Sequence, residues 1–146
     1  MGWFRWFAVL GVVAGCGSVA PGGLVAYRVE ADAIREPLAP VPGDAARGRD
    51  VVLGRDANCV LCHAMPGTGG RSMGNLGPAL SGVGARLNAG QLRLRIVDSV
   101  RLNRDTIMPS YYRIDGLNDV AEPWRGKPVL TAQQVEDAVS YLLTLR

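Results

Sequence analysis

The clearest pattern of hydrophobic and polar positions lies at the C-terminal end of the chain. Apolar residues recur there at positions i, i+3, i+4, i+7 and i+8, namely Val135, Ala138, Val139, Leu142 and Leu143. This spacing places them on one face of a helix. Thr131 and Gln134 precede the stripe with the spacing of a capping box, in which each side chain bonds to the other residue's backbone. The pattern therefore predicts an amphipathic helix after Thr131.

Earlier in the chain, two weaker patterns also predict helices. Asp44 can cap a helix over residues 45–53, and Gly54 directly after it is a typical stop. Farther along, apolar residues recur at helical spacing at Leu92, Ile96 and Val97. That spacing predicts a second helix over about residues 89–100.

The segments between these helices lack any regular period. Residues 66–84 are rich in glycine and residues 108–128 are irregular, so both are predicted to be long loops. Residues 21–42 mix proline and glycine with charged residues, which predicts a flexible linker before a domain over residues 43–146. No segment alternates like a strand. The sequence therefore predicts an all-α domain of three or more short helices joined by long loops.

Residues 1–20 have the three-part layout of an export signal. Arg5 supplies a positive charge, a short apolar run covers residues 7–14, and small residues follow. The run is too short for a membrane-spanning helix, which needs about 20 residues. The residues that end at Cys16 also resemble a bacterial lipobox, whose cysteine is lipidated. The prediction is a periplasmic domain that is either free after cleavage of the signal or lipid-anchored at Cys16.

The charge of the chain argues against nucleic acid as a partner. The formal net charge is +3, and fifteen of the sixteen basic residues are arginines scattered among acidic residues. With only two Phe and no basic run, the chain lacks the stacking aromatics and basic stripe of single-strand binders. Four arginines are expected to lie on a solvated helix face rather than to steer an anionic partner: Arg93, Arg95, Arg101 and Arg104.

The motif with the most specific chemistry is Cys59-Val60-Leu61-Cys62-His63, the attachment pattern of a c-type haem. Residues i and i+3 of a helical turn share a face, so both thiols can bond to the two vinyl groups of one porphyrin. The alternatives are a redox dithiol, a zinc site and a structural disulfide. A dithiol enzyme needs a βαβ context and a zinc site needs four ligands. The sequence predicts one covalent haem c, bound by Cys59 and Cys62, with His63 on the iron.

Because His63 is the only histidine, the sixth ligand of the iron is expected to be a methionine. Met1 leaves with the predicted signal and Met65 is too close to His63 in sequence to reach the other face of the ring, which leaves Met73 and Met108. A chain that returned at Met73 would have little length left to surround the haem. Met108, on a proline-stiffened loop after the second helix, is therefore the predicted ligand. Three aromatic residues are expected to pack in the same pocket: Tyr111, Tyr112 and Trp124.

The motifs of the chain resemble those of the class I c-type cytochromes. The haem motif, the segment Asn75-x-Gly77-Pro78-x-Leu80 and the pair Met108-Pro109 occur in the order found in that family. The resemblance implies a class I cytochrome c fold wrapped around one covalent haem. It also implies that the carbonyl group of Pro78 accepts a hydrogen bond from the second ring nitrogen of His63, which would fix the orientation of the ring.

A narrower resemblance to the SoxX family covers nearly all of the domain. It rests on four blocks that occur in order: residues 74–86, 92–98, 108–112 and 130–142. SoxX proteins are the monohaem subunits of the sulfur-oxidising SoxAX complex. The resemblance implies a periplasmic heterodimer with a SoxA-like cytochrome. That complex acts as an L-cysteine S-thiosulfotransferase, which joins thiosulfate to a cysteine of the carrier protein SoxYZ.

In that scheme the reactive cysteine belongs to SoxA, and the haem of this chain passes the released electrons to a downstream cytochrome. The residues agree with this division, because Cys59 and Cys62 would be bound as thioethers and His63 would bind iron. No residue of the chain is therefore assigned a catalytic role. The alternatives are a stand-alone periplasmic electron shuttle with no sulfur role, and a haem enzyme or sensor with an open iron position.

Overall fold

The computed structural model describes residues 23–68 and 72–146. Within these residues the α-helices are α1 (Ala45–Leu53), α2 (Val83–Arg86), α3 (Ala89–Asp98) and α4 (Ala132–Thr144). Short 3-10 turns lie at Cys59–Leu61, Ser99–Arg101 and Glu122–Trp124. Strand-type pairing in the same part of the chain consists of isolated bridge residues, such as the bridge between Glu30 and Ala33, and no strand is formed there. The predicted all-α architecture is confirmed.

Side chains that cap the helix starts set the helix boundaries. α1 begins after the predicted cap, Asp44. At the start of α4, the Thr131 hydroxyl accepts a hydrogen bond from the backbone N–H of Gln134 (3.2 Å), whose side chain accepts one from Thr131 N–H (2.9 Å). This is the predicted capping box. α3 begins with the same arrangement between Asn88 and Gln91, with both hydrogen bonds 3.0 Å long. The spacing of the apolar residues does not indicate that this helix starts after Asn88.

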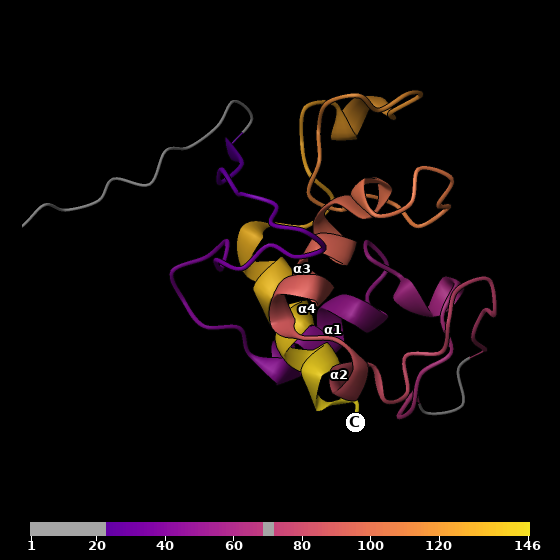
Figure 1. The fold of residues 1–146 in the computed structure, drawn as a ribbon. Coiled ribbons are helices and arrows are strands. Elements are labelled where there is room, and N and C mark those ends of the chain that lie inside the picture. The colour runs from indigo at the N-terminus through magenta and orange to yellow at the C-terminus, as the bar shows by residue number, and fades with distance from the viewer. Residues whose placement is uncertain (1–22, 69–71) are drawn as a thin grey trace, which may run out of the picture.

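The longest helix, α4, packs most closely against α1 (Figure 1). At Gly48 of α1, a Cβ atom would overlap the carbonyl oxygen of Asp137 and would lie 2.9 Å from the Cβ of Tyr141. The lack of a side chain at Gly48 therefore lets the two helix backbones approach each other. The core of the domain contains these large, fully buried side chains: Ile34, Val52, Leu94, Val97, Tyr112 and Val135.

Residues 24–38, which we call the N-terminal strap, are part of the packed domain. Ile34 and Leu38 are buried in the core. The backbone N–H of Ile34 donates a hydrogen bond of 3.0 Å to the carbonyl group of Gly90 in α3. The flexible linker predicted over residues 21–42 is therefore not found in the strap. Its apolar residues are irregularly spaced, so no period in the sequence indicates their burial.

A buried ion pair joins the strap to α3 and α4. Arg93 of α3 donates two hydrogen bonds of 2.7 Å to the two carboxylate oxygens of Glu136 in α4. The same guanidinium donates to the carbonyl group of Ile34 (2.6 Å), and Glu136 accepts from the backbone N–H of Leu38 (2.8 Å). Arg93 is only 4% exposed, so the expectation that it lies on a solvated helix face is wrong. Both charges are tolerated in the core because each has several hydrogen-bond partners.

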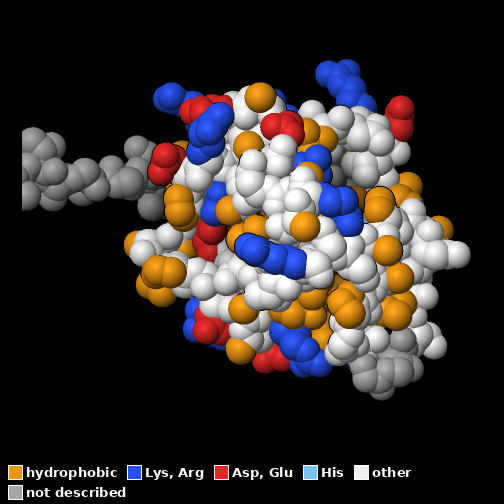
Figure 2. All heavy atoms as spheres, turned by 60° about the horizontal axis from the view of Figure 1, so that its bottom comes forward, with side chains coloured by type: hydrophobic (Ala, Val, Ile, Leu, Met, Phe, Trp, Pro, Cys, Tyr) orange, Lys and Arg blue, Asp and Glu red, His pale blue; other side chains and the backbone are white. Residues whose placement is uncertain are grey.

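The surface carries mixed charge. On the face drawn in Figure 2, basic and acidic side chains are scattered among hydrophobic ones, and Arg101 and Arg104 are exposed as expected. None of the helices in residues 23–68 and 72–146 is long and apolar enough to cross a membrane. The predicted export signal over residues 1–20, with Cys16, lies outside the described residues.

Candidate functional site

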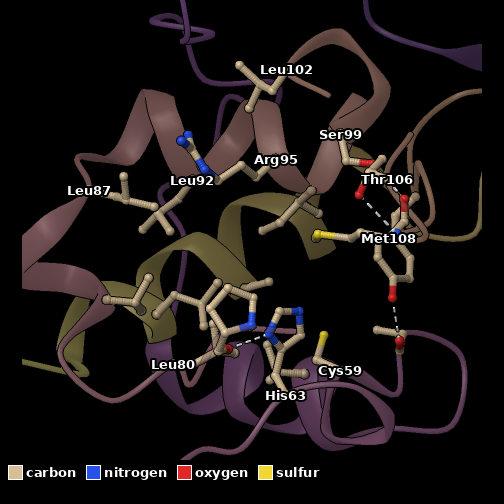
Figure 3. Close-up of a pocket in the computed structure, with 18 of the residues that line it drawn as sticks. Cys59, His63, Leu80, Leu87, Leu92, Arg95, Ser99, Leu102, Thr106 and Met108 are labelled. Carbon is tan, nitrogen blue, oxygen red and sulfur yellow. Dashed lines mark hydrogen bonds between the residues drawn. The ribbon is translucent and has the colours of Figure 1, made fainter. Parts of the chain in front are cut away.

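A cavity of about 460 Å³ lies between α3 and the segment that carries the cysteine motif (Figure 3). Its wall is mostly apolar and takes residues from all four of the labelled helices. The volume is within the range of about 300 to 1,000 Å³ that is typical of cofactor pockets. Cys59 and His63 of the cysteine motif line this cavity together with Met108, which lies far along the chain from them.

The cysteine motif folds into a tight turn. Asn58 starts the turn with a φ angle of 40°, in the left-handed region that asparagine tolerates better than most residues. The carbonyl oxygen of Cys59 then accepts hydrogen bonds from the backbone N–H groups of Cys62 (3.2 Å) and His63 (2.9 Å). Both cysteines are half-buried and form no disulfide. Cys59 lines the cavity, whereas Cys62 lies on the same turn without being part of the cavity wall.

The protonation of Cys59 argues against a reactive dithiol at this turn. Burial raises the pKa of the Cys59 thiol to about 11. A thiol with so high a pKa is protonated at neutral pH and is a poor nucleophile. The turn therefore lacks the lowered thiol pKa that is typical of a redox dithiol.

The imidazole ring of His63 is fixed by two neighbours. Its Nδ1 atom lies 2.7 Å from the carbonyl oxygen of Pro78, as the resemblance to class I cytochromes implies. Because a carbonyl group can only accept, Nδ1 carries the proton and Nε2 keeps its lone pair free for a metal. At Gly77, a Cβ atom would overlap the ring and would lie 2.6 Å from Nδ1. Glycine at that position lets the loop pass directly beside the imidazole.

The two candidate methionines occupy different environments. Met108 lines the cavity, and Figure 3 shows its sulfur on the side of the cavity opposite His63. Met73 is 40% exposed, is not part of the cavity wall, and its sulfur accepts a hydrogen bond of 3.2 Å from the backbone N–H of Met65. The geometry therefore favours Met108 as the partner of His63 across the cavity.

The three aromatic residues expected in the pocket separate in the structure. Tyr111 lines the cavity, and its hydroxyl donates a buried hydrogen bond of 2.8 Å to the carbonyl group of Ala57. Burial raises the pKa of the Tyr111 phenol above its usual range. Tyr112 is instead in the core, where its hydroxyl accepts a hydrogen bond of 2.9 Å from the backbone N–H of Val25. Trp124 is 41% exposed and is not part of the cavity wall, so the expectation holds for Tyr111 only.

Two arginines, Arg86 and Arg95, lie on the cavity wall, and the sequence does not indicate either as a site residue. Arg86 donates hydrogen bonds to the carbonyl groups of Ser81 (2.7 Å) and Ala79 (3.1 Å), and Arg95 donates to that of Gln91 (2.9 Å). Each arginine keeps further N–H donors beyond these bonds. Single charges inside helical segments carry no sequence signal that separates a cavity wall from an ordinary surface.

The donors around the cavity fit a covalently bound iron porphyrin. The site offers an apolar wall for the ring, thiols on one turn, an imidazole with a free Nε2 atom and a thioether opposite it. Haem also carries two propionate groups, and the two wall arginines, Arg86 and Arg95, offer positive charges to match them. Gly77 provides further support, because any side chain at that position would overlap the imidazole ring.

Comparisons with known proteins agree with this site. A family model for cytochrome c matches residues 45–146. Among solved structures, the chain is similar to a chain in the crystal structure of SoxXA from P. pantotrophus, with 31% sequence identity and a TM-score of 0.75. That alignment covers 89% of this chain and 98% of the other. A search of curated protein sequences finds no match.

Proposed function

The chain belongs to the cytochrome c family as a SoxX-like monohaem member with one covalent haem c, and from that premise we propose that the cavity is its haem site. In that site Cys59 and Cys62 would form the thioether bonds, and His63 and Met108 would hold the iron. When bound, the haem supplies a one-electron redox couple. The proposal rests above all on one observation: a single apolar cavity is lined by Cys59, His63 and Met108.

The residues of the site have distinct roles in electron transfer. His63 is held by Pro78 in the tautomer that leaves Nε2 free to bind iron. Met108 provides a thioether, which raises the reduction potential relative to a second histidine. The apolar wall would keep water away from bound iron, and iron held by both His63 and Met108 would have no open position for substrate. These features support an electron carrier over a haem enzyme or a gas sensor.

We further propose that this carrier works as the haem subunit of a SoxXA-type complex. The similarity to a SoxXA chain supports the proposal because it extends over 98% of that chain. In the proposed complex, a SoxA-like cytochrome forms a heterodimer with this chain and contributes the reactive cysteine of an L-cysteine S-thiosulfotransferase. Thiosulfate is joined to a cysteine of a SoxYZ carrier, and two electrons are released for each bond formed. This chain passes the electrons one at a time to a downstream cytochrome.

The chemistry of the described residues supports this division of labour. Once Cys59 and Cys62 are bound as thioethers, residues 23–68 and 72–146 contain no free thiol. His63, which is the chain's single histidine, is then occupied as a ligand. Among the described residues nothing remains to act as the nucleophile for the sulfur chemistry, so the proposal assigns it to a partner. A periplasmic location, reached through the predicted export signal, is part of the same proposal.

The test is the mass of the carrier protein. Purified chain, thiosulfate and reduced SoxYZ-type carrier are mixed with and without a SoxA-type cytochrome, and the carrier is weighed by mass spectrometry. The proposal expects a thiosulfonate adduct at a catalytic rate only when the partner is present. An adduct formed at that rate without the partner would refute the assignment as an electron-transfer subunit. Absence of the adduct with the partner present would favour a stand-alone electron shuttle.

A further inference from the structure

The segment that carries Met108 is attached to the C-terminal end of α3. After the methionine, the backbone N–H groups of Tyr111 and Tyr112 donate hydrogen bonds to the carbonyl groups of Ile96 (3.0 Å) and Val97 (3.3 Å). These carbonyl groups belong to the last turn of α3. Carbonyl groups in the last turn of a helix have no N–H partner within that helix. The chain after Met108 is therefore fixed relative to the wall of the cavity.

At the methionine itself, the attachment is made by a side chain. The hydroxyl of Ser99, directly after α3, donates a hydrogen bond of 2.6 Å to the carbonyl oxygen of Met108. Ser99 is 5% exposed and lines the cavity. The backbone N–H of Met108 bonds to the hydroxyl of Thr106 (3.2 Å), but that contact lies within the loop. It cannot fix the loop relative to α3, whereas the bond from Ser99 can.

We propose that Ser99 is a positioning residue that holds the sulfur of Met108 in place for the iron. The proposal rests on the proposed role of Met108 as ligand and deepens it. The carbonyl group and the side chain of Met108 share one Cα atom, so a bond that fixes the carbonyl limits the space through which the sulfur can move. A supporting hydrogen bond of this kind matters most in the ferric state, because a thioether favours ferrous iron and binds ferric iron less strongly.

A purely structural role for Ser99 makes a different prediction. In that case the hydroxyl only satisfies a buried carbonyl group, and its loss lowers stability without changing ligand exchange at the iron. Thr144 offers a matched control, because its hydroxyl donates a bond of the same kind and length, 2.6 Å, to the carbonyl group of Tyr141 at the end of α4. Neither Thr144 nor Tyr141 is part of the cavity wall.

The experiment measures displacement of the thioether by imidazole in the ferric holoprotein, followed by loss of the far-red methionine-to-iron absorption band. Ser99→Ala is expected to speed displacement about fivefold, which corresponds to one hydrogen bond. Ser99→Thr, which keeps the hydroxyl, is expected to stay near the wild-type rate. Ser99→Cys, a weaker donor of similar size, is expected to fall between them. Thr144→Val is expected to leave the rate unchanged.

Three outcomes would overturn the proposal. The first is that imidazole displaces the thioether at the wild-type rate in both Ser99→Ala and Ser99→Cys. The second is that Thr144→Val accelerates this displacement as much as Ser99→Ala does. Either result would reduce Ser99 to a structural role while leaving Met108 as the ligand. A far-red band that persists in Met108→Ala, measured in parallel, would instead remove the proposed ligand itself. The failure of the inference and the failure of the proposed ligation are thus distinguishable.

Discussion

The two sides of the cavity are built from the chain in different ways. On the His63 side, the two cysteines and the histidine are contiguous, and the loop that holds the imidazole arrives at Pro78, only fifteen residues later. On the Met108 side, the sulfur depends on contacts between the end of α3 and a loop that returns to it. A short motif can therefore specify the first side, whereas the second exists only once the domain has folded.

α4 supports both sides through adjacent carboxylates that differ in environment. Glu136 bonds to Arg93 of α3, on the Met108 side, and the side chains of both are almost fully buried. Asp137 bonds to Arg47 of α1, on the His63 side, and the Arg47 side chain is 55% exposed. The difference in burial predicts that the Met108 side depends more heavily on its ion pair than the His63 side does.

The largest effect is expected when covalent attachment is removed. Cys59→Ala combined with Cys62→Ala should abolish covalent haem and leave the domain largely unfolded, because the proposed haem site is the cavity that the helices surround. A haem stain on a denaturing gel and far-ultraviolet circular dichroism check both parts. Haem that stays with the denatured double variant would contradict the central assignment.

The next effect separates the two sides of the iron. Met108→Ala should give a high-spin iron with an exchangeable sixth position and a lowered reduction potential, because the thioether stabilises the ferrous state. Covalent haem and His63 ligation should survive. Met73→Ala is the matched control, since Met73 is not part of the cavity wall, and it should leave the absorption spectrum nearly unchanged. The reverse pattern would assign the ligand to Met73.

The third prediction addresses the buried pair on the Met108 side. Glu136→Gln leaves the charge of Arg93 buried without its counter-ion, which should lower the free energy of unfolding by about 3 kcal/mol or more. The far-red band should also be lost at a lower temperature than in the wild type. Glu30→Gln is the control, because its partner Arg35 is 71% exposed and such surface pairs contribute about 1 kcal/mol or less. Equal losses in the two variants would remove the distinction.

The comparison also explains what the sequence could and could not predict. The capping box at Thr131 and the stop at Gly54 are local signals, and the structure agrees with them. The cysteine motif is equally local, and it folds into one turn whose Cys59 and His63 line the cavity. The buried position of Arg93 and the packing of the strap depend on partners far along the chain, such as Glu136. An arginine on a helix has the same sequence signature whether it faces water or a buried carboxylate, so no period in the sequence separates the two cases.

The last and smallest effect concerns Asp137 on the His63 side. The pKa of Asp137 is lowered to about 2, mainly by hydrogen bonds from the Arg47 side chain. Burial acts to raise this pKa, and a hydrogen bond from the backbone N–H of Asp44 lowers it further. A carboxyl group whose pKa is lowered in the folded state stabilises the protein above the unfolded pKa of 3.8 and loses that contribution as pH falls through the folded pKa. Asp137→Asn should therefore lower the free energy of unfolding by about 2 kcal/mol at pH 7. The difference from wild type should shrink between about pH 4 and pH 2.

Urea unfolding of wild type and Asp137→Asn across this pH range measures the difference directly, so that any acid transition of the haem site common to both proteins cancels. Asp50→Asn, the same change at an exposed position of α1, should show little loss at any pH. Because Asp137 bonds to α1 and not to α3, the far-red band of Asp137→Asn should keep its wild-type intensity at pH 7. A variant that lost the band along with its stability would mean that the two sides of the cavity are coupled through α4. A stability difference that did not change with pH would assign the contribution of Asp137 to packing rather than to its charge.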